Sequence, residues 1–420
     1  MSNNASRTRA YLAAILIGLL PVWMILLPLD MTRNPEVWQI FLRANSLAVP
    51  IVQLVVVLLA MGNGFSIFRS MKALPGITKY AAFLWLIVAG FVSFQADKDH
   101  LLAAIGIFKI VMMALFFLAL LDLRRTSGPQ FLQILWIAVG SGVFLYILLW
   151  VVHMILVMPQ GDDWVVRIPG VNNVRHTGQF AIAGVIAGLF TITAFRDIPS
   201  IWLRWALPLF FSSSALGLAL WTGSRGPLLA SIIVMLVAIG LVAQSRKTVV
   251  VFCLGSVLAA IAIVAPLPVP HPIYGIFGAI GVEDVTADGQ HDSSSGRTEL
   301  WKATINKITE KPLLGWGINQ FVVSGPSKPV AFFHPHNFPL QIMFSGGVIS
   351  SLLFVLILFP ALRKLRWPDH TGPSAAGVAG VAGIVAYSFY DGALYFSYPT
   401  MIFLIAIATS IAPVPSHADP

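Results

Sequence analysis

The sequence has few charged residues and a single cysteine. Charged side chains make up 10% of its 420 residues and hydrophobic side chains 57%, with a mean hydropathy of +0.84. Soluble domains carry about 25% charged residues, so an ordinary soluble protein is excluded and a membrane protein is indicated. The one cysteine, Cys253, lies in an apolar run. A disulfide within the chain is therefore excluded, and Cys253 is interpreted as a small buried hydrophobic residue.

Signatures of nucleotide and nucleic-acid binding are lacking as well. The glycine-rich run from Gly377 to Gly383 has neither the lysine nor the preceding strand of a phosphate-binding loop. This run, like Gly184 and Gly188, indicates close packing of helices instead. The net charge is +9 and the isoelectric point about 9.8, but the basic residues lie between hydrophobic segments and not in one patch. We therefore expect membrane lipids, and no nucleic acid, as partners.

Twelve hydrophobic segments are candidates for membrane spans. They cover residues 10–29, 46–67, 79–96, 101–121, 131–157, 177–195, 201–221, 227–243, 249–267, 338–361, 375–397 and 399–413. In hydrocarbon every backbone N–H and C=O must be satisfied within its own segment, so the segments are predicted to be helices. The first one resembles a signal peptide, but its length and the lack of a small-residue cleavage site predict an uncleaved span. The predicted fold class is an all-α polytopic membrane protein of about twelve helices.

The basic residues predict an orientation. With a cytoplasmic N-terminus, the connections on that side hold Arg7, Arg9, Arg69, Lys72, Lys79, Arg124, Arg125, Arg196, Arg204, Arg246, Lys247, Arg363, Lys364 and Arg366. The short connections on the other side hold only Arg33, Arg43, Lys98, Arg167, Arg175 and Arg225. Cytoplasmic loops are enriched in lysine and arginine, so both termini are predicted to be cytoplasmic. The chain then divides into spans one to nine (1–267), an outer loop (268–337), and spans ten to twelve with the C-terminus (338–420).

The outer loop contains an amphipathic helix. From Arg297 onward, one helical face carries Leu300, Trp301, Thr304, Ile305 and Ile308. Such a helix is expected to lie on the membrane surface, with its apolar face toward lipid or the bundle. Pro312 is expected to end it, and a turn is predicted at 315–317.

Three clusters on the predicted outer side carry unusual side chains. Arg225 lies in a very short turn between two spans, where it points into a cavity or simply contacts lipid headgroups. Arg297 follows Ser294-Ser295-Gly296, which forms either a plain helix cap or, with free N–H groups, an anion-binding pocket. His334 and His336 head the tenth span, but the carboxylates around them are too scattered to complete a metal site. A structural role is the alternative for these histidines.

Two ionisable residues lie in or at the end of spans. Lys109 is several residues deep, where a charge is costly unless it pairs or lines a cavity. It is a candidate to hold a phosphate or neutralise a carboxylate, or else its side chain reaches toward the interface. Asp391, near the outer end of the eleventh span, is a candidate partner of an arginine.

Together these features resemble the O-antigen ligase family. The resemblance rests on three motifs. The first is the Gly223-Ser224-Arg225-Gly226 turn, and the second is Arg297 with Pro312-Leu313-Leu314-Gly315-Trp316-Gly317 downstream. The third is His336-Asn337, with Gly347 ten residues after Asn337. Ser350 replaces the last glycine of the family's pattern, a difference that concerns helix packing. The resemblance covers roughly residues 170–360 and the topology of the whole chain.

The resemblance implies an inverting glycosyltransferase of GT-C-like architecture that works on the periplasmic face of a bacterial inner membrane, without nucleotide sugar, metal or other cofactor. Its donor would be a glycan on undecaprenyl pyrophosphate, and its acceptor a sugar hydroxyl of the lipid A–core oligosaccharide. The family's catalytic residues correspond to Arg225, Arg297 and His336. Further candidates for substrate binding are Arg175, Lys109, His334, Asn337 and Asp391.

The residues fit this chemistry independently of the resemblance. A pyrophosphate is an activated leaving group, and fixed guanidinium groups stabilise its charge as it departs. Histidine side chains titrate near neutral pH and can take a proton from an acceptor hydroxyl. An O-antigen polymerase or a protein O-oligosaccharyltransferase would share donor and architecture and stays open. A transporter or flippase of lipid-linked sugars would instead place its charges near the membrane midplane, where only Lys109 lies deep.

Overall fold

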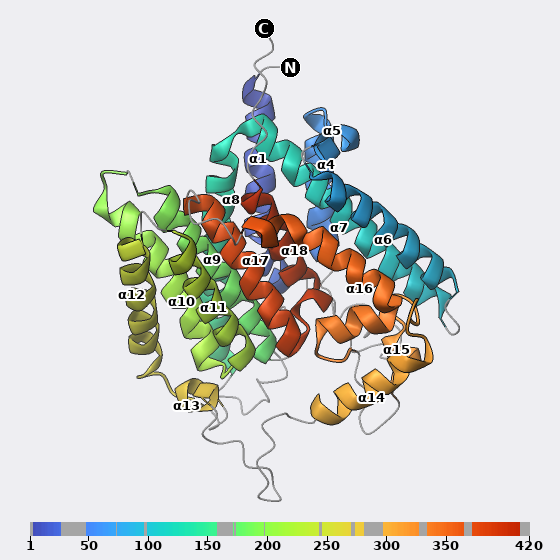
Figure 1. Ribbon diagram of the computed structural model, residues 1–420. Coiled ribbons are helices and arrows are strands. Elements are labelled where there is room, and N and C mark those ends of the chain that lie inside the picture. Colours follow the sequence, from blue (N-terminus) through green and yellow to red (C-terminus); the bar gives the residue numbers. More distant parts are fainter. Residues whose placement is uncertain are drawn as a thin grey trace, which may run out of the picture.

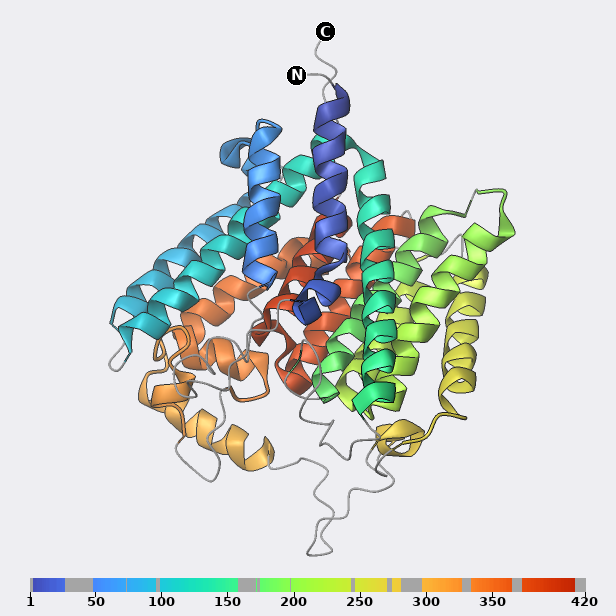
Figure 2. The ribbon, with the colours of Figure 1, turned by 180° about the vertical axis from the view of Figure 1, so that it is seen from behind.

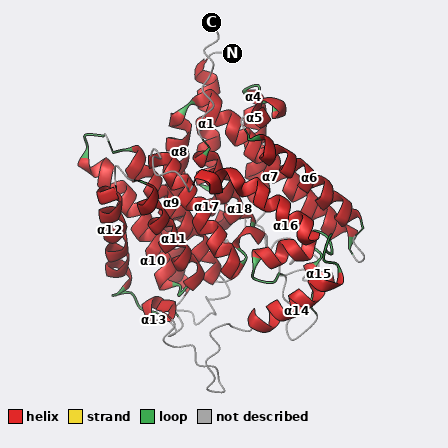
Figure 3. Cartoon of the chain, in the orientation of Figure 1, coloured by secondary structure: helices red, strands yellow, loops and turns green. Residues whose placement is uncertain are grey.

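The fold was analysed in a computed structural model of the chain. It describes residues 3–26, 48–72, 74–95, 99–157, 171, 174–196, 198–242, 246–269, 274–280, 297–326, 334–364 and 372–411. Helices are the secondary structure throughout these ranges, and no β-strand occurs in them (Figures 1 and 3). The all-α prediction is confirmed for this part of the chain.

The long apolar helices identify a multi-pass membrane protein. Seven helical segments have the length and composition to cross a membrane: α6 (Gly76–Phe94), α7 (His100–Ser127), α8 (Pro129–Val157), η3 with α10 (Trp202–Ala206 and Leu207–Trp221), α12 (Arg246–Val264), α16 (Phe338–Lys364) and α17 (Gly372–Asp391). Shorter apolar helices are α4 (Ala48–Gly62), α9 (Gly178–Ala194), α11 (Arg225–Leu241) and α18 (Ser397–Ser410). The first predicted span overlaps two helices, α1 (Asn3–Gly18) and α2 (Leu20–Leu26). Every predicted span thus overlaps helix, although the number that cross the bilayer stays a prediction.

Large apolar side chains cover the outside of the bundle. Phe83 on α6 is 62% exposed and Leu258 on α12 is 67% exposed. A surface of this kind is unfavourable in water, but it is the expected surface of a bundle in hydrocarbon.

Helix α9 forms the centre of the bundle. Each of its residues from Gly178 to Thr193 is buried, and α8, α10, α11 and α17 pack against it. A Cβ atom on Gly188 would lie 2.8 Å from the carbonyl oxygen of Pro208, and one on Gly184 would lie 2.5 Å from Cβ of Ala215. The prediction that these glycines allow close helix packing is confirmed.

The two ends of the bundle differ. At one end, Arg124 near the end of α7 donates hydrogen bonds to the carbonyl oxygens of Ala408 and Ile411, at the end of α18. The first residues of α1 lie at the same end (Figures 1 and 2). The short helices α13 (Gly275–Ile280), α14 (Arg297–Glu310) and α15 (Phe321–Ser324) lie at the opposite end, which we call the α14 end.

Helix α14 confirms the predicted amphipathic helix. Leu300, Thr304 and Ile308 are buried against the first turns of α16, whereas Ile305 is 49% exposed. With 3.6 residues per turn, residues 300, 304 and 308 form one row, and Ile305 lies well to the side of it. Helix α16 therefore covers the row of Leu300, Thr304 and Ile308, and Ile305 lies outside the contact with the bundle.

Helix α16 is broken, and a loop fills the break. Gly347 has φ 65° and ψ −166°, which interrupts the helical hydrogen bonds. The segment 312–317 replaces them: N–H groups of Trp316 and Gly317 donate to the carbonyls of Phe344 and Ser345 at 2.7 and 2.9 Å. In return Val348 N–H donates to Pro312 O at 2.9 Å. The free backbone groups are thereby satisfied inside the protein, as hydrocarbon requires.

Candidate functional site

One carboxylate joins three elements at the α14 end. Asp391 is the last residue of α17, and its Oδ1 lies 3.3 Å from Nη2 of Arg297, the first residue of α14. The same Oδ1 lies 3.4 Å from Nδ1 of His336, which immediately precedes Asn337 and α16. The structure therefore brings together two of the three predicted catalytic residues and confirms Asp391 as the partner of an arginine.

Tyrosines of α17 complete the surroundings of this carboxylate. The Tyr387 hydroxyl, one turn before Asp391, donates to Oδ2 at 3.2 Å. Arg297 also donates to the carbonyl oxygen of Tyr390 at 3.0 Å, and its guanidinium lies 5.2 Å from the centroid of the Tyr390 ring. Both oxygens of Asp391 and two nitrogens of Arg297 are thus held in fixed directions.

The backbone of His336 has an unusual conformation. Its φ is 52°, in the left-handed region that residues other than glycine rarely adopt. Its backbone N–H donates to Nδ1 of His334 at 3.1 Å. The next residue, Asn337, accepts from Leu340 N–H at 3.0 Å and so caps the first turn of α16, while its Nδ2 donates to Phe389 O at 2.9 Å. These contacts give Asn337 a structural role; its predicted contact with substrate stays a prediction.

His334 lies underneath His336 in an aromatic cluster. Its ring is buried and stacks on Tyr395, with centroids 4.4 Å apart, and it meets the edge of Phe396 at 5.2 Å. Burial, and then the nearby positive charges of His336, His176 and Arg297, hold the pKa of His334 well below its ordinary value. His334 is therefore neutral at neutral pH.

Arg225 lies at the same end of the bundle, on α11. Gly223, with φ 62°, forms the tight turn before it, and Arg225 Nε donates to Gly278 O of α13 at 3.2 Å. The neighbouring Gly226 packs on α17, because a Cβ there would lie 3.0 Å from the ring of Tyr387 and 3.4 Å from that of Tyr390. Arg225, the third predicted catalytic residue, thus directly precedes Gly226. Gly226 packs against Tyr387 and Tyr390, which bind Asp391 and Arg297.

Two connections fix Arg297 relative to His336. Trp301, one turn into α14, donates its indole N–H to Pro335 O at 2.8 Å. The loop after α14 is inserted into the break of α16 at Gly347. His336 and Asn337 immediately precede this same helix, which begins nine residues before Gly347. Both ends of α14 are therefore tied to the segment that carries His336.

The sequence that carries these residues matches a known family. The sequence profile of the O-antigen ligases matches residues 209–355, which include Arg225, Arg297 and His336. An O-antigen ligase from Pseudomonas aeruginosa is 27% identical over 214 residues, which cover 48% of this chain and 47% of the relative. Over residues 209–355 the chain is thus similar to the O-antigen ligase family. The resemblance found in the sequence motifs is thereby confirmed.

A second relative covers a shorter region. A protein of Rickettsia conorii, described as a candidate polysaccharide ligase, is 31% identical over 115 residues, which are 24% of this chain and 28% of the relative. The chain spans less than half the length of the curated relatives that it matches. Asp391 and Tyr387 lie beyond the region that the ligase profile matches.

Helix η2 (Val174–Thr177) brings a further predicted residue to the α14 end. The backbone of Arg175 lies in this turn, but its side chain is outside the described part of the structure, so its contact with substrate stays a prediction. The ring of the adjacent His176 packs on Phe396, with centroids 5.2 Å apart. Burial lowers the pKa of His176, and the charge of Asp391 opposes that shift.

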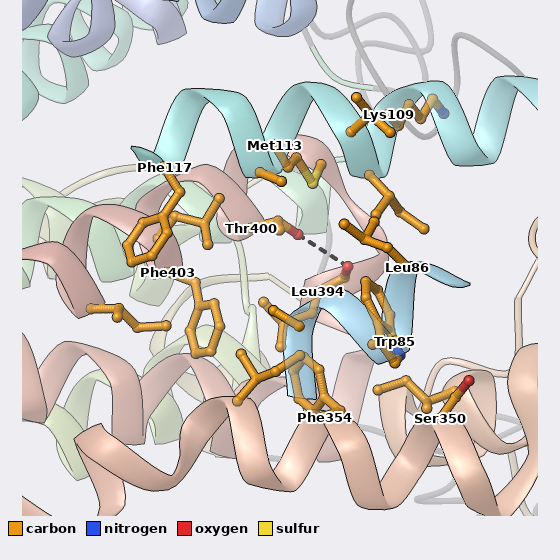
Figure 4. A pocket seen from close by; sticks show the side chains of 18 of the residues that line it. Trp85, Leu86, Lys109, Met113, Phe117, Ser350, Phe354, Leu394, Thr400 and Phe403 are labelled. Atoms are coloured by element: carbon orange, nitrogen blue, oxygen red, sulfur yellow. Dashed lines mark hydrogen bonds between the residues drawn. The ribbon is translucent and has the colours of Figure 1, made fainter. Parts of the chain in front are cut away.

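A cavity of about 500 Å³ lies between α6, α7, α16 and α18 (Figure 4). Its walls are mostly apolar. Lys109 of α7, the lysine that the sequence places inside a span, is one of the residues that line it. Tyr395, on which His334 stacks, and Phe338, in the first turn of α16, line it toward the histidines. Met71 and Ile411 line it toward the opposite end of the bundle. The cavity thus extends from beneath the histidines toward the end of the bundle where α18 terminates.

Sequence reasoning did not single out the tyrosines, His176 or Phe396 of this cluster. Tyr387 and Asp391 are four positions apart on α17, and this spacing was the available signal for the tyrosine. His176 and Tyr395 reach the site from short 3-10 turns, and neither turn has a periodic pattern that predicts it.

Proposed function

We propose that this protein is an O-antigen ligase. It transfers a glycan from undecaprenyl pyrophosphate to a sugar hydroxyl of the lipid A–core oligosaccharide, with inversion and without a metal ion. The observation that supports this most is the contact of His336 and Arg297 with one carboxylate, Asp391, at the α14 end. A candidate base and a candidate anion-binding group then lie close enough to act on one substrate.

The proposed base acts through the far nitrogen of His336. When Nδ1–H donates to Asp391, Nε2 is unprotonated and accepts the proton of the acceptor hydroxyl. The hydroxyl oxygen attacks the anomeric carbon on the face opposite the pyrophosphate. The bond between that carbon and the pyrophosphate oxygen breaks, undecaprenyl pyrophosphate leaves, and the anomeric configuration is inverted. Asp391 stabilises the imidazolium that forms and keeps the ring oriented.

The arginines are proposed to stabilise the leaving group. Negative charge increases on the pyrophosphate as its bond to the sugar breaks, and guanidinium groups contact phosphate oxygens in pairs. Arg297 is held by Asp391 and Tyr390, and Arg225 by Gly278, so neither group has to be ordered during the reaction. Fixed charges of this kind favour the transition state over the ground state.

The location is also part of the proposal. We place the α14 end on the periplasmic face of the inner membrane and both termini in the cytoplasm. The basic residues support this orientation: Arg124 and Arg125 lie at the end of α7 that is opposite α14, among the connections that carry the excess of lysine and arginine. Loop 268–337 is then periplasmic.

The acceptor separates the ligase from its nearest alternatives. Purified protein in lipid nanodiscs is given lipid-linked glycan with lipid A–core, with more lipid-linked glycan, or with a protein acceptor. The ligase forms product with lipid A–core. Product only from lipid-linked glycan would show a polymerase, and product only from the protein would show an oligosaccharyltransferase. In cells, deletion should remove long-chain lipopolysaccharide while lipid-linked glycan remains.

A further inference from the structure

We propose that His334 is a positioning residue that holds the backbone of His336 in its reactive conformation by accepting a hydrogen bond on an unprotonated Nδ1. This inference rests on the proposed role of His336 as the base. His334 is not proposed to touch substrate, because its ring is buried beneath the site.

The conformation of His336 requires support from its surroundings. In the left-handed region, the Cβ atom of a residue other than glycine crowds the adjacent backbone, so this conformation is unfavourable unless other contacts maintain it. The φ of His336 is 52°, and its N–H donates to His334 Nδ1 at 3.1 Å. The hydrogen bond therefore stabilises the conformation that directs the His336 ring toward Asp391.

The ring of His334 is itself fixed on several sides. Tyr395 stacks on one of its faces, and the edge of Phe396 packs against it. Gly392 has φ 64°, and a Cβ there would lie 3.2 Å from His334 Nδ1 and 3.4 Å from the backbone nitrogen of Asn337. The left-handed glycine after Asp391 thus leaves room for the ring, and the ring has little freedom to turn away from His336.

The hydrogen bond also restricts the proton on His334. A nitrogen that accepts from a backbone N–H has no proton of its own, so the neutral ring must carry its proton on Nε2. A protonated His334 has two N–H groups and would oppose the N–H of His336. The charged and titratable groups around the ring are His336, His176 of η2, Tyr395 of η4, Arg297 of α14 and Asp391 of α17. Most are basic and disfavour a charge on His334.

His336 is then held from two sides. Asp391 fixes the ring through Nδ1, and His334 fixes the backbone through N–H. Loss of either contact moves Nε2 relative to the acceptor hydroxyl, and a displacement of about 1 Å costs on the order of 10²-fold in rate.

Two amide variants of His334, which resemble each other in size and polarity, test the role of Nδ1 as hydrogen-bond acceptor. In His334→Asn the side-chain oxygen can occupy the place of Nδ1, so the hydrogen bond is kept without a titratable group. In His334→Gln the amide extends to the place of Nε2, and the acceptor beside His336 is lost. We expect His334→Asn to retain most of the wild-type kcat and His334→Gln to lose about 10²-fold in kcat with KM for lipid-linked glycan unchanged. Equal kcat values for the two variants would overturn the proposal.

The pH profile gives a readout that packing alone would not change. In the wild type, protonation of His334 at acidic pH removes the acceptor of the His336 N–H and should lower kcat. In His334→Asn the acceptor cannot be protonated, so kcat should fall less steeply at acidic pH. An equally steep fall in both proteins would contradict the proposal.

The state of the ring can be measured without any transfer assay. Wild-type protein labelled with ¹⁵N-histidine in nanodiscs is compared with His334→Asn, which assigns the imidazole signals of His334. We expect a neutral ring with its proton on Nε2 at pH 7. A proton on Nδ1 would overturn the inference even if the protein is an active ligase. Conversely, the expected tautomer without glycan transfer would contradict the proposed function and leave the hydrogen bond established.

Discussion

The Oδ1 atom of Asp391 lies 3.3 Å from Nη2 of Arg297 and 3.4 Å from Nδ1 of His336. One carboxylate oxygen thus connects the end of α17 with the start of α14 and the residues that lead into α16. In the proposed mechanism, this oxygen orients the base and holds an anion-binding group beside it. Its removal should therefore impair the chemical step more than the binding of substrate.

Asp391→Asn tests the charge with almost no change of shape. The amide no longer stabilises an imidazolium and can hold His336 in the wrong tautomer, so kcat should fall by about 10²- to 10⁴-fold while KM changes little. The measurement is initial-rate transfer by protein in nanodiscs. Glu299→Gln, an exposed carboxylate two residues after Arg297, serves as the control and should have no effect. An unchanged kcat in Asp391→Asn would remove this residue from the mechanism.

Arg297→Lys tests the geometry of the guanidinium. Arg297 bonds Asp391 with one terminal nitrogen and Tyr390 O with the other, and lysine cannot make both contacts in these directions. We expect at least a tenfold loss of kcat/KM at normal protein levels, equivalent to about 1.4 kcal/mol. Lys302→Arg on the exposed side of α14 is the matched control. Full activity of Arg297→Lys would show that a point charge is sufficient there.

Gly347→Ala tests the broken helix. A Cβ at this position would overlap the carbonyl of Leu313, and alanine disfavours φ 65°. The expected destabilisation is about 1–3 kcal/mol, with reduced transfer because α14 is displaced from α16. Gly240→Ala in α11, where nothing lies within 4 Å, is the control and should be neutral or stabilising. Thermal unfolding in detergent measures both; equal midpoints would contradict the role given to Gly347.

The buried histidines predict an acid-sensitive fold. The pKa values of His334 and His176 are lowered in the folded protein, whereas unfolded histidines have their ordinary value of about 6.5. Below that pH the unfolded chain binds protons that the folded chain does not, so folding stability falls as the pH drops. The loss reaches at most about 1.4 kcal/mol per pH unit for each histidine. Unfolding midpoints at pH 7.5 and pH 5.5 check this, and His334→Asn should show the smaller decrease.

Much of the fold was accessible from the sequence. The hydrophobic runs located the helices, and the apolar row of residues 300, 304 and 308 located α14. The pairing of 312–317 with the break in α16 was not predictable, because it is a contact between backbone groups distant in sequence. Gly347 was recognised as part of a motif, but the carbonyl that requires glycine there belongs to Leu313.

The site was accessible only in part. Arg225, Arg297 and His336 were selected from motifs and from the predicted orientation, and the structure brings Arg297 and His336 to Asp391. The left-handed backbone of His336 could not be predicted, because only a small fraction of residues other than glycine adopt that region, histidine included. The acceptor that supports it is the His334 ring, whose position depends on Tyr395 and Phe396, and these residues follow two helices later in the chain, after α16 and α17.

The most direct measurement is transfer by purified protein and its His336→Gln variant in nanodiscs, with lipid-linked glycan and lipid A–core. We expect the wild type to form a glycosidic bond of inverted configuration to the core and to release undecaprenyl pyrophosphate, and His336→Gln to form at least 10²-fold less product at equal thermal stability. Movement of lipid-linked glycan across the bilayer without bond formation would contradict the account, as would equal transfer by the His336→Gln variant.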